Sequence, residues 1–207
     1  MGAFRGSITF SKLYVRGELP RGFRDRFVKA IRLSAFRPLD PNEDVDHRVG
    51  WVAIDDPFDA ELTNEKVFFN DYLALGFRLD RWRIPAPLWK AAFRAAERDL
   101  LAKRKIEKLS RAQKKELEAV VAAQLRRRLV PAMKVIDVSW SLNEGVVRFF
   151  TQSPKQLELM SELFVKTFGL ELDLDGPYVA AEQRGLPKKV LDALPKLEPA
   201  IFAERGR

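Results

Sequence analysis

The chain has 207 residues and a net charge of +8 at pH 7, with 46% hydrophobic and 32% charged residues. This length suits one large domain or two small ones with a hydrophobic core, and the composition excludes wholesale disorder and collagen-like repeats. There is no cysteine and a single histidine, His47, which excludes disulfides, thiolate zinc sites and multi-histidine metal sites.

Alternating apolar residues predict a first strand over residues 6–16, followed by a helix that opens at Pro20. A short strand is expected at 34–39, and two acidic loops surround residues 49–52. Residues 66–84 then predict two aromatic-rich strands with a turn or bulge at Leu75–Gly76.

The clearest element pair is a helical hairpin. Pro85 and Pro87 begin a helix that runs to about Lys108, with one apolar stripe at helical spacing formed by Trp89, Phe93, Ala96 and Leu100. Ser110 and Gln113 have the spacing of a capping box and predict a second helix, which ends near Pro131. The short break between the helices favours an antiparallel hairpin.

After Pro131 the pattern returns to strands. Strands are predicted at 135–141 and 146–151 around a turn at 143–145, followed by a helix from Ser153 to Phe168, a strand at 170–175 and a weak helix at 187–194. We expect an α+β fold of mainly antiparallel sheets with packed helices. Residues 1–85 and 131–178 form its core, 86–130 an inserted basic hairpin and 179–207 a proline-bearing tail.

The charge is segregated along the chain. Residues 78–128 contain sixteen Lys and Arg against six Asp and Glu, whereas residues 40–65 contain nine acidic residues and one basic residue. A dense basic region of this kind is typical of proteins that bind polyanions, although two helices charged only for solubility are the alternative.

No apolar run approaches the roughly 18 residues that a membrane span requires, and the N-terminus lacks the apolar core of a signal peptide. The sequence therefore predicts a cytoplasmic protein with no membrane partner.

The ordered motifs over residues 6–175 resemble those of the RdgC family of bacterial recombination-associated proteins. The resemblance rests on Ala35-Phe36-Arg37-Pro38 before Gly50-Trp51-Val52, on Ile84-Pro85 before two charged helices, on Leu129-Val130-Pro131 after them, and on Trp140, Asn143 and Gly145 before a helix at Ser153. It implies a nucleoid-associated, non-enzymatic homodimer that binds double-stranded DNA with little sequence preference and restrains a RecA-type recombinase. Better-known members form a ring around the duplex and have a longer C-terminal region.

Basic residues of the hairpin and the preceding strand are the DNA-binding candidates, because lysine and arginine neutralise phosphates without reading bases. The candidates are Arg78, Arg81, Arg83, Lys103, Arg104, Lys105, Lys108, Arg111, Lys114, Lys115, Arg126, Arg127 and Arg128. Hairpin geometry brings Lys103–Lys105 near Arg111–Lys115 at the tip. It places Arg126–Arg128 at the base, near the strand arginines. No catalytic residue, metal site or cofactor is predicted.

Four alternatives remain open at the level of sequence. Carboxylates in 55–61 and 171–175 could hold Mg²⁺ in a nuclease, although they do not show the usual converging pattern. The hairpin could instead dock an acidic protein, and the acidic 40–65 segment could meet a basic patch on a second copy. Strand aromatics could also stack on unpaired bases, although core packing is their commoner role. These aromatics are Phe68, Phe69, Tyr72, Phe77, Phe149 and Phe150.

Overall fold

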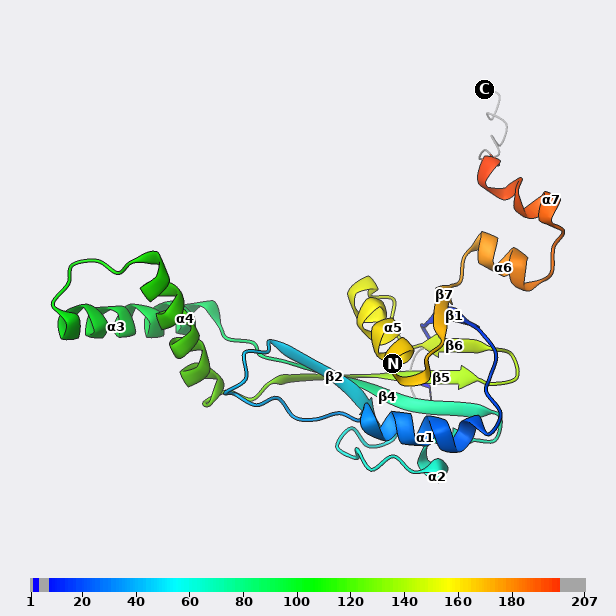
Figure 1. Cartoon of the computed structure of the whole chain (residues 1–207), viewed down its shortest axis with the longest axis horizontal. Coiled ribbons are helices and arrows are strands. Elements are labelled where there is room, and N and C mark those ends of the chain that lie inside the picture. The colour runs from blue at the N-terminus through cyan, green and yellow to red at the C-terminus, as the bar shows by residue number, and fades with distance from the viewer. Residues whose placement is uncertain (1, 4–7, 198–207) are drawn as a thin grey trace, which may run out of the picture.

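The computed structural model describes residues 2–3 and 8–197, and it confirms the α+β fold (Figure 1). Seven strands form one curled sheet in the order β2-β4-β5-β6-β1-β7, with β3 paired to β4. The strands are β1 Ser11–Arg16, β2 His47–Val52, β3 Phe68–Phe69, β4 Tyr72–Arg81, β5 Ala132–Ser141, β6 Val146–Phe149 and β7 Glu171–Leu174. Every pairing between these strands is antiparallel.

The helices fall into three groups: two that pack on the sheet with a short one beside it, two that form the inserted hairpin, and two short C-terminal ones with a final 3-10 turn. They are α1 Phe23–Leu33, α2 Asn64–Val67, α3 Ala86–Arg104, α4 Arg111–Arg126, α5 Pro154–Phe168, α6 Pro177–Gln183, α7 Lys188–Leu191 and the 3-10 turn Leu194–Lys196.

The main core lies between the sheet and helices α1 and α5. Aromatic rings from all three elements meet there: the Phe27 ring centroid is 5.0 Å from that of Phe168 and 5.7 Å from that of Trp140. Trp51 is fully buried, and its Nε1 donates a 2.8 Å hydrogen bond to Thr167 Oγ1. Burial of large aromatic side chains on one sheet face is the main stabilising contribution to this part of the fold.

The longest ladder in the sheet determines where the helical hairpin emerges. Strands β4 and β5 pair over ten residues, from Tyr72 opposite Ser141 to Arg81 opposite Ala132. The last residue of β4, Arg81, pairs with the first residue of β5, Ala132, at one end of the sheet. The chain therefore leaves the sheet after Arg81 and returns at Ala132. Helices α3 and α4 fill this connection and extend from the sheet as an arm, as Figure 1 shows on its left side.

The arm has its own small apolar core. Leu117, Val121 and Leu125 of α4 pack against Trp89 and Phe93 of α3, along the stripe that the sequence predicts. No residue of α3 is fully buried, since the helix contacts a partner along one side only. The second helix begins at the predicted capping box: Ser110 Oγ accepts from Gln113 N, and Gln113 Oε1 accepts from Ser110 N.

The predicted turn or bulge at Leu75–Gly76 is wrong. Residues 72–81 form one continuous strand, and the chain reverses at Asn70–Asp71 instead. Gly76 lies in the middle of β4, where there is little space for a side chain: a Cβ at this position would be 2.8 Å from Val52 Cγ2. Close packing, rather than a turn, explains this glycine.

Two further expectations differ in detail. The strand expected at 34–39 is reduced to an isolated bridge between Ala35 and Trp51. The tail expected to hold one weak helix forms α6, α7 and a 3-10 turn, which leave the body at the end opposite the arm (Figure 1). Positions 198–207 of that predicted tail, and 6–7 of the first predicted strand, lie outside the described residues.

Candidate nucleic-acid interface

The tip of the arm gathers most of the predicted basic residues. Helix α3 ends at Arg104, and Lys105 adopts a left-handed conformation with φ 53° that turns the chain toward Ser110. The basic side chains around this turn all lie on exposed residues: Lys103, Arg104, Lys105, Lys108, Arg111, Lys114 and Lys115. Among them, within the described part of the chain, Lys114 makes an ion pair, 3.7 Å from Glu97 across the hairpin.

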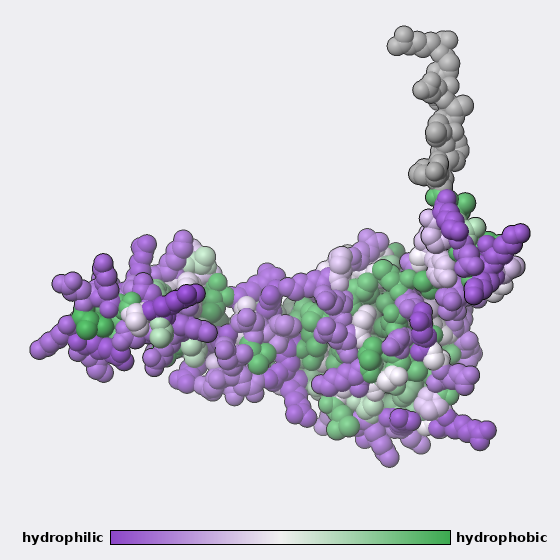
Figure 2. Space-filling view, turned by 45° about the horizontal axis from the view of Figure 1, so that its top comes forward, coloured by the Kyte–Doolittle hydropathy of each residue, from purple (hydrophilic) through white to green (hydrophobic). Residues whose placement is uncertain are grey.

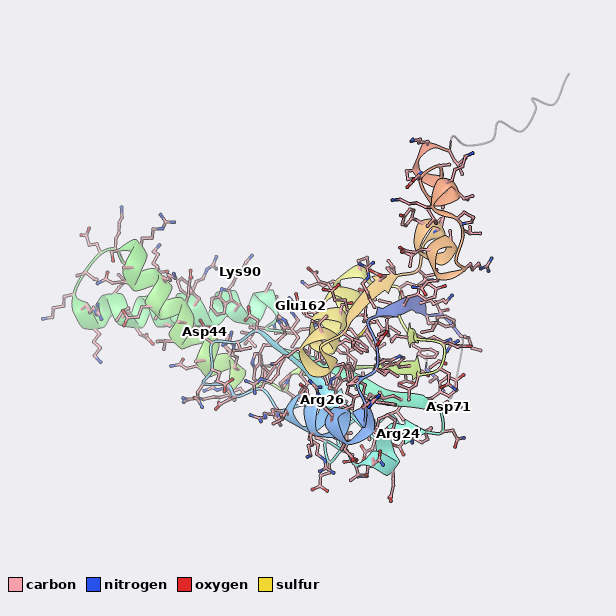
Figure 3. All side chains as sticks on the ribbon, turned by 45° about the vertical axis from the view of Figure 1, so that its right-hand side comes forward. Arg24, Arg26, Asp44, Asp71, Lys90 and Glu162 are labelled. Atoms are coloured by element: carbon pink, nitrogen blue, oxygen red, sulfur yellow. The ribbon has the colours of Figure 1, made fainter. Side chains whose placement is uncertain are left out.

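A second basic surface lies along α3, and the sequence analysis missed it. Lys90, Arg94 and Arg98 are spaced by four residues, which places them on one face of a helix. All three are exposed, and Figure 3 shows Lys90 projecting from the arm close to its base. This set, here called the α3 stripe, could have been found from the i, i+4, i+8 spacing. Its members are not adjacent in sequence, so it does not stand out as a basic run.

The base of the arm contains an arginine that is not available to a ligand. The Arg126 side chain is only 8% exposed; its Nη2 donates to Asp46 Oδ1 at 2.9 Å and its Nη1 donates to the Glu43 carbonyl at 3.0 Å. Asp44 is a further 3.7 Å partner of Nη1. The prediction that Arg126 faces DNA is therefore corrected: it anchors the arm to the loop before β2.

The other two arginines at the base differ from Arg126 in exposure. Arg127 is exposed, although its Nη2 donates a 2.7 Å hydrogen bond to Asn42 Oδ1 of the same loop. Arg128 is exposed, and no side-chain hydrogen bond or ion pair holds it within the described residues. Of the three consecutive arginines, Arg128 is the one free to bind a phosphate.

Arg78 is also corrected. Its guanidinium forms two hydrogen bonds to the Asp80 carboxylate, at 2.9 and 2.6 Å, and a third to the Pro57 carbonyl. It stacks 4.0 Å from the ring centroid of Phe36. Because β-strand side chains alternate, Arg78 lies on the sheet face opposite Arg81 and is covered by the loops around β2. It is a packing residue.

Arg81 and Arg83 remain accessible. Both are exposed, and both line a pocket of about 320 Å³ at the base of the arm, together with Lys134 of β5 and Lys155 of α5. His47, the lone histidine, lies on the same wall because β2 pairs it directly with Arg81. The sequence analysis did not include Lys134 and Lys155, which are far from the hairpin in sequence.

Most of the strand aromatics are core residues. Phe77 and Phe149 have no exposed surface, and Phe68 and Phe150 are at most 9% exposed, so base stacking on these four is excluded in this conformation. Phe69 and Tyr72 are exposed at the β3–β4 reversal. They lie at the far end of β4 from the arm, so the aromatic and basic surfaces do not coincide.

Several carboxylates of the proposed magnesium clusters are engaged by lysine or arginine. Asp173 pairs with Arg16 at 2.7 Å, and Asp175 lies 3.7 Å from Lys12 Nζ. Asp59 accepts a hydrogen bond from the Lys66 ammonium, which holds the pKa of Asp59 below its usual range. Within residues 2–3 and 8–197, no three His, Asp or Glu side chains are grouped to hold a metal ion.

The acidic 40–65 segment has partners within its own chain. Glu43 pairs with Arg48, and Asp44 and Asp46 pair with Arg126 (the position of Asp44 beside the arm is labelled in Figure 3). These acidic residues thus pair with arginines of their own chain, whereas the sequence alone also allowed contact with a basic patch on a second copy.

The arm surface is dominated by hydrophilic residues, whereas apolar surface is more frequent on the body (Figure 2). No protein-family model matches the chain, and no curated protein matches its sequence. None of the helices over the described ranges combines the length and apolar character that crossing a membrane would require.

Proposed function

We propose that this protein binds double-stranded DNA through the phosphate backbone, without sequence preference and without chemistry of its own. The observation that carries the proposal is the excess of exposed, unpaired cations on the arm. Residues 86–130 contain thirteen Lys and Arg against five Asp and Glu. In the described structure, ion pairs engage only Lys114 and Arg126 of these thirteen.

The geometry of the α3 stripe supports this proposal. Lys90 and Arg98 are eight residues apart, which at about 1.5 Å per residue is roughly 12 Å along the helix. Phosphates of one DNA strand repeat about every 3.4 Å along the duplex axis, so the stripe matches a run of three or four of them. The exposed tip cations add further positive charge at the far end of the same arm. Flexible lysine and arginine side chains then neutralise phosphates without requiring a defined base sequence.

The resemblance to the RdgC family suggests a cellular role for this DNA binding. A protein that occupies duplex DNA would restrict access by a RecA-type recombinase and would be nucleoid-associated. We propose a homodimer on the same ground, which sedimentation equilibrium of the purified chain tests directly. A strand-exchange assay with RecA and increasing amounts of this protein tests the recombination part. Unchanged exchange at saturating occupancy of the DNA would contradict it.

The primary test is fluorescence anisotropy of a random-sequence duplex across a salt series without divalent metal. We expect steeply salt-dependent binding, because log K falls by about 0.9 per log unit of salt for each neutralised phosphate. A triple variant, Lys90→Ala/Arg94→Ala/Arg98→Ala, should reduce that slope by up to about 3, since each residue removes one phosphate contact.

The matched control removes the same charge from the body. Arg21, Arg26 and Lys29 are exposed residues at or on α1, away from the arm (Figure 3 labels Arg26). The triple alanine variant at these positions should leave the slope unchanged. Equal losses in both variants would mean that net charge, rather than the arm, governs binding. Absence of binding at low salt would overturn the proposal and favour a protein partner for the arm.

A further inference from the structure

The pocket at the base of the arm results from a mismatch between the sheet and its helical cover. Leu79 and Arg81 alternate with Asp80 along β4, so they lie on the same sheet face as the buried Phe77, and Arg83 joins them at the pocket from the segment after the strand. The N-terminal part of α5 borders the pocket on this face through Lys155, Gln156 and Leu159. Beyond it, the ends of β4 and β5 are uncovered until the arm begins, and this leaves the pocket of about 320 Å³.

Positive charge converges on this pocket from separate segments of the chain. Arg81 comes from β4, Arg83 from the linker to α3, Lys134 from β5 and Lys155 from α5. Over the described residues, no ion pair or side-chain hydrogen bond engages Arg81, Arg83 or Lys155. Lys134 Nζ donates to the neutral Gln156 Oε1 at 3.1 Å. No carboxylate belongs to the described lining.

Two other arginines near the base of the arm differ from the pocket cations. Arg78 of β4 and Arg126 of α4 each have a carboxylate within 3 Å, which balances their charge. Among the described residues the pocket cations have no such carboxylate, so they repel one another, and a bound anion would relieve this repulsion. Arginine forks recognise phosphate oxygens in a bidentate manner, and a lysine ammonium adds a point charge.

The apolar part of the pocket lining favours a ligand with an organic group over a bare inorganic ion. Leu79, Ala132 and Leu159 supply an apolar surface next to the cations, since Leu79 and Ala132 share a sheet face with Arg81. The volume lies at the lower end of the roughly 300–1,000 Å³ that small-molecule sites occupy. A phosphate on the cationic side with an attached organic group on the apolar side satisfies both halves of the lining.

We propose that this pocket binds a phosphate ester, either as a free nucleotide or as part of a nucleic-acid strand. Arg81 and Arg83 hold the phosphate oxygens, with Lys134 and Lys155 beside them. The organic portion packs on Leu79 and Leu159. The site does not require the arm to bind DNA, and its occupant is chosen by phosphate chemistry rather than by the sequence of bases.

The chain contains a built-in reporter for this site. His47 is the only histidine in the sequence, and it lines the pocket. Protein labelled with ¹³C-histidine therefore gives one set of imidazole NMR signals, and any change in them reports on this pocket. The probes are thymidine 5′-monophosphate, inorganic phosphate and thymidine, each added at constant ionic strength.

We expect a saturable shift of the His47 signals with thymidine 5′-monophosphate, a weaker one with phosphate, and none with thymidine. The double variant Arg81→Ala/Arg83→Ala should weaken nucleotide binding by at least about tenfold, because it removes the charge-assisted hydrogen bonds to phosphate. Both residues are exposed, so the variant should retain the fold. Arg21→Ala/Arg26→Ala is the charge-matched control and should bind as the parent does.

Three outcomes would overturn the proposal: no saturable shift with the nucleotide, an equal shift with thymidine, or equal affinity in the double variant. A nucleotide that binds while duplex DNA does not would support the pocket and reject the proposed function. Duplex binding with neither a nucleotide response nor a His47 shift would reject the pocket and support the proposed function.

The source of the phosphate is distinguished with two short duplexes, one 5′-phosphorylated and one with a 5′-hydroxyl. If the pocket takes a terminal monoester, the phosphorylated duplex binds more tightly and the difference disappears in Arg81→Ala/Arg83→Ala. If it takes a backbone diester, both duplexes shift His47 equally, and the double variant weakens both. Duplex binding without a His47 shift in either case would restrict the pocket to free nucleotides.

Discussion

Arg126 Nη2 and Asp46 Oδ1 lie 2.9 Å apart, and this pair joins the end of the helical arm to the loop before β2. The two residues are eighty positions apart in sequence. The arginine is buried, whereas the Asp46 side chain is 79% exposed. The pair thus fixes the base of the arm to the body. Without it, only the two chain connections from β4 to α3 and from α4 to β5 would hold the arm, and the arm could pivot.

Arg126 and Arg128 should separate stability from DNA binding. Arg126→Met keeps the aliphatic stem but removes the charge-assisted hydrogen bonds, and should lower the free energy of unfolding by about 1–3 kcal/mol. It should leave the salt slope of DNA binding unchanged. Arg128→Met should do the opposite, with little loss of stability and a slope lower by about 0.9. Urea unfolding and anisotropy measure the two effects, and an unchanged slope for Arg128→Met would remove it from the interface.

Asp80 should be important for stability because it compensates a buried arginine. The side chains of Arg78 and Asp80 are 12% and 6% exposed. Asp80→Ala leaves the guanidinium without its carboxylate and should cost about 3 kcal/mol in unfolding free energy. The control is Glu144→Ala, which breaks the exposed Arg148 pair and should cost less than about 1 kcal/mol. Similar losses for the two variants would show that the Arg78 pair is well solvated.

Gly50 should not tolerate a side chain. The chain crosses β2 so closely at Phe36 that a Cβ on Gly50 would lie 2.4 Å from the Phe36 Cα. Gly50→Ala must displace backbone and should destabilise the protein by about 3 kcal/mol. Gly176→Ala is the control, since no atom lies within 4 Å of its Cβ position, and it should change stability by less than about 0.5 kcal/mol. Thermal unfolding of both variants checks this, and a stable Gly50→Ala would mean that the 34–36 segment can move away.

The capping box at Ser110 should stabilise the tip of the arm. Ser110→Ala removes the hydrogen bond to Gln113 N and should cost α4 about 1 kcal/mol. Ser153 begins α5 without a side-chain capping bond, so Ser153→Ala should have a much smaller effect on its own helix. Amide hydrogen exchange resolves the two helices, and faster exchange confined to the first turns of α4 is expected. Unchanged protection in Ser110→Ala would show that the arm core alone holds the tip.

Incubation with Mg²⁺ should leave duplex DNA intact. Asp59, Asp173 and Asp175 are engaged by Lys66, Arg16 and Lys12, so their carboxylates are not poised to converge on a metal ion. A supercoiled plasmid incubated with excess protein and Mg²⁺ is the sensitive assay, because one nick changes its mobility. Nicking that persists through purification, and is lost in Asp173→Asn/Asp175→Asn, would require a nuclease instead.

The sequence by itself determined the elements that follow from local physical chemistry. The apolar stripe at Trp89 and Phe93, the capping box at Ser110 and the glycine cap at Gly169 each depend on residues within a few positions of one another, so helices α3, α4 and α5 could be predicted. The antiparallel α+β class followed from the same alternation of strands and helices. The excess of positive charge in the hairpin was likewise readable from composition alone.

Only the tertiary structure decided which of those charges are free. Arg126 and Arg128 are nearly equivalent in sequence, yet one is buried against Asp46 and the other is exposed. Gly76 reads as a turn but lies in mid-strand, because Val52 packs over it. Lys155 joins Arg81 at one pocket across more than seventy residues. The physical reason is the same in each case: ion pairing and burial depend on neighbours brought together by the sheet, and local patterns contain no information about such distant neighbours.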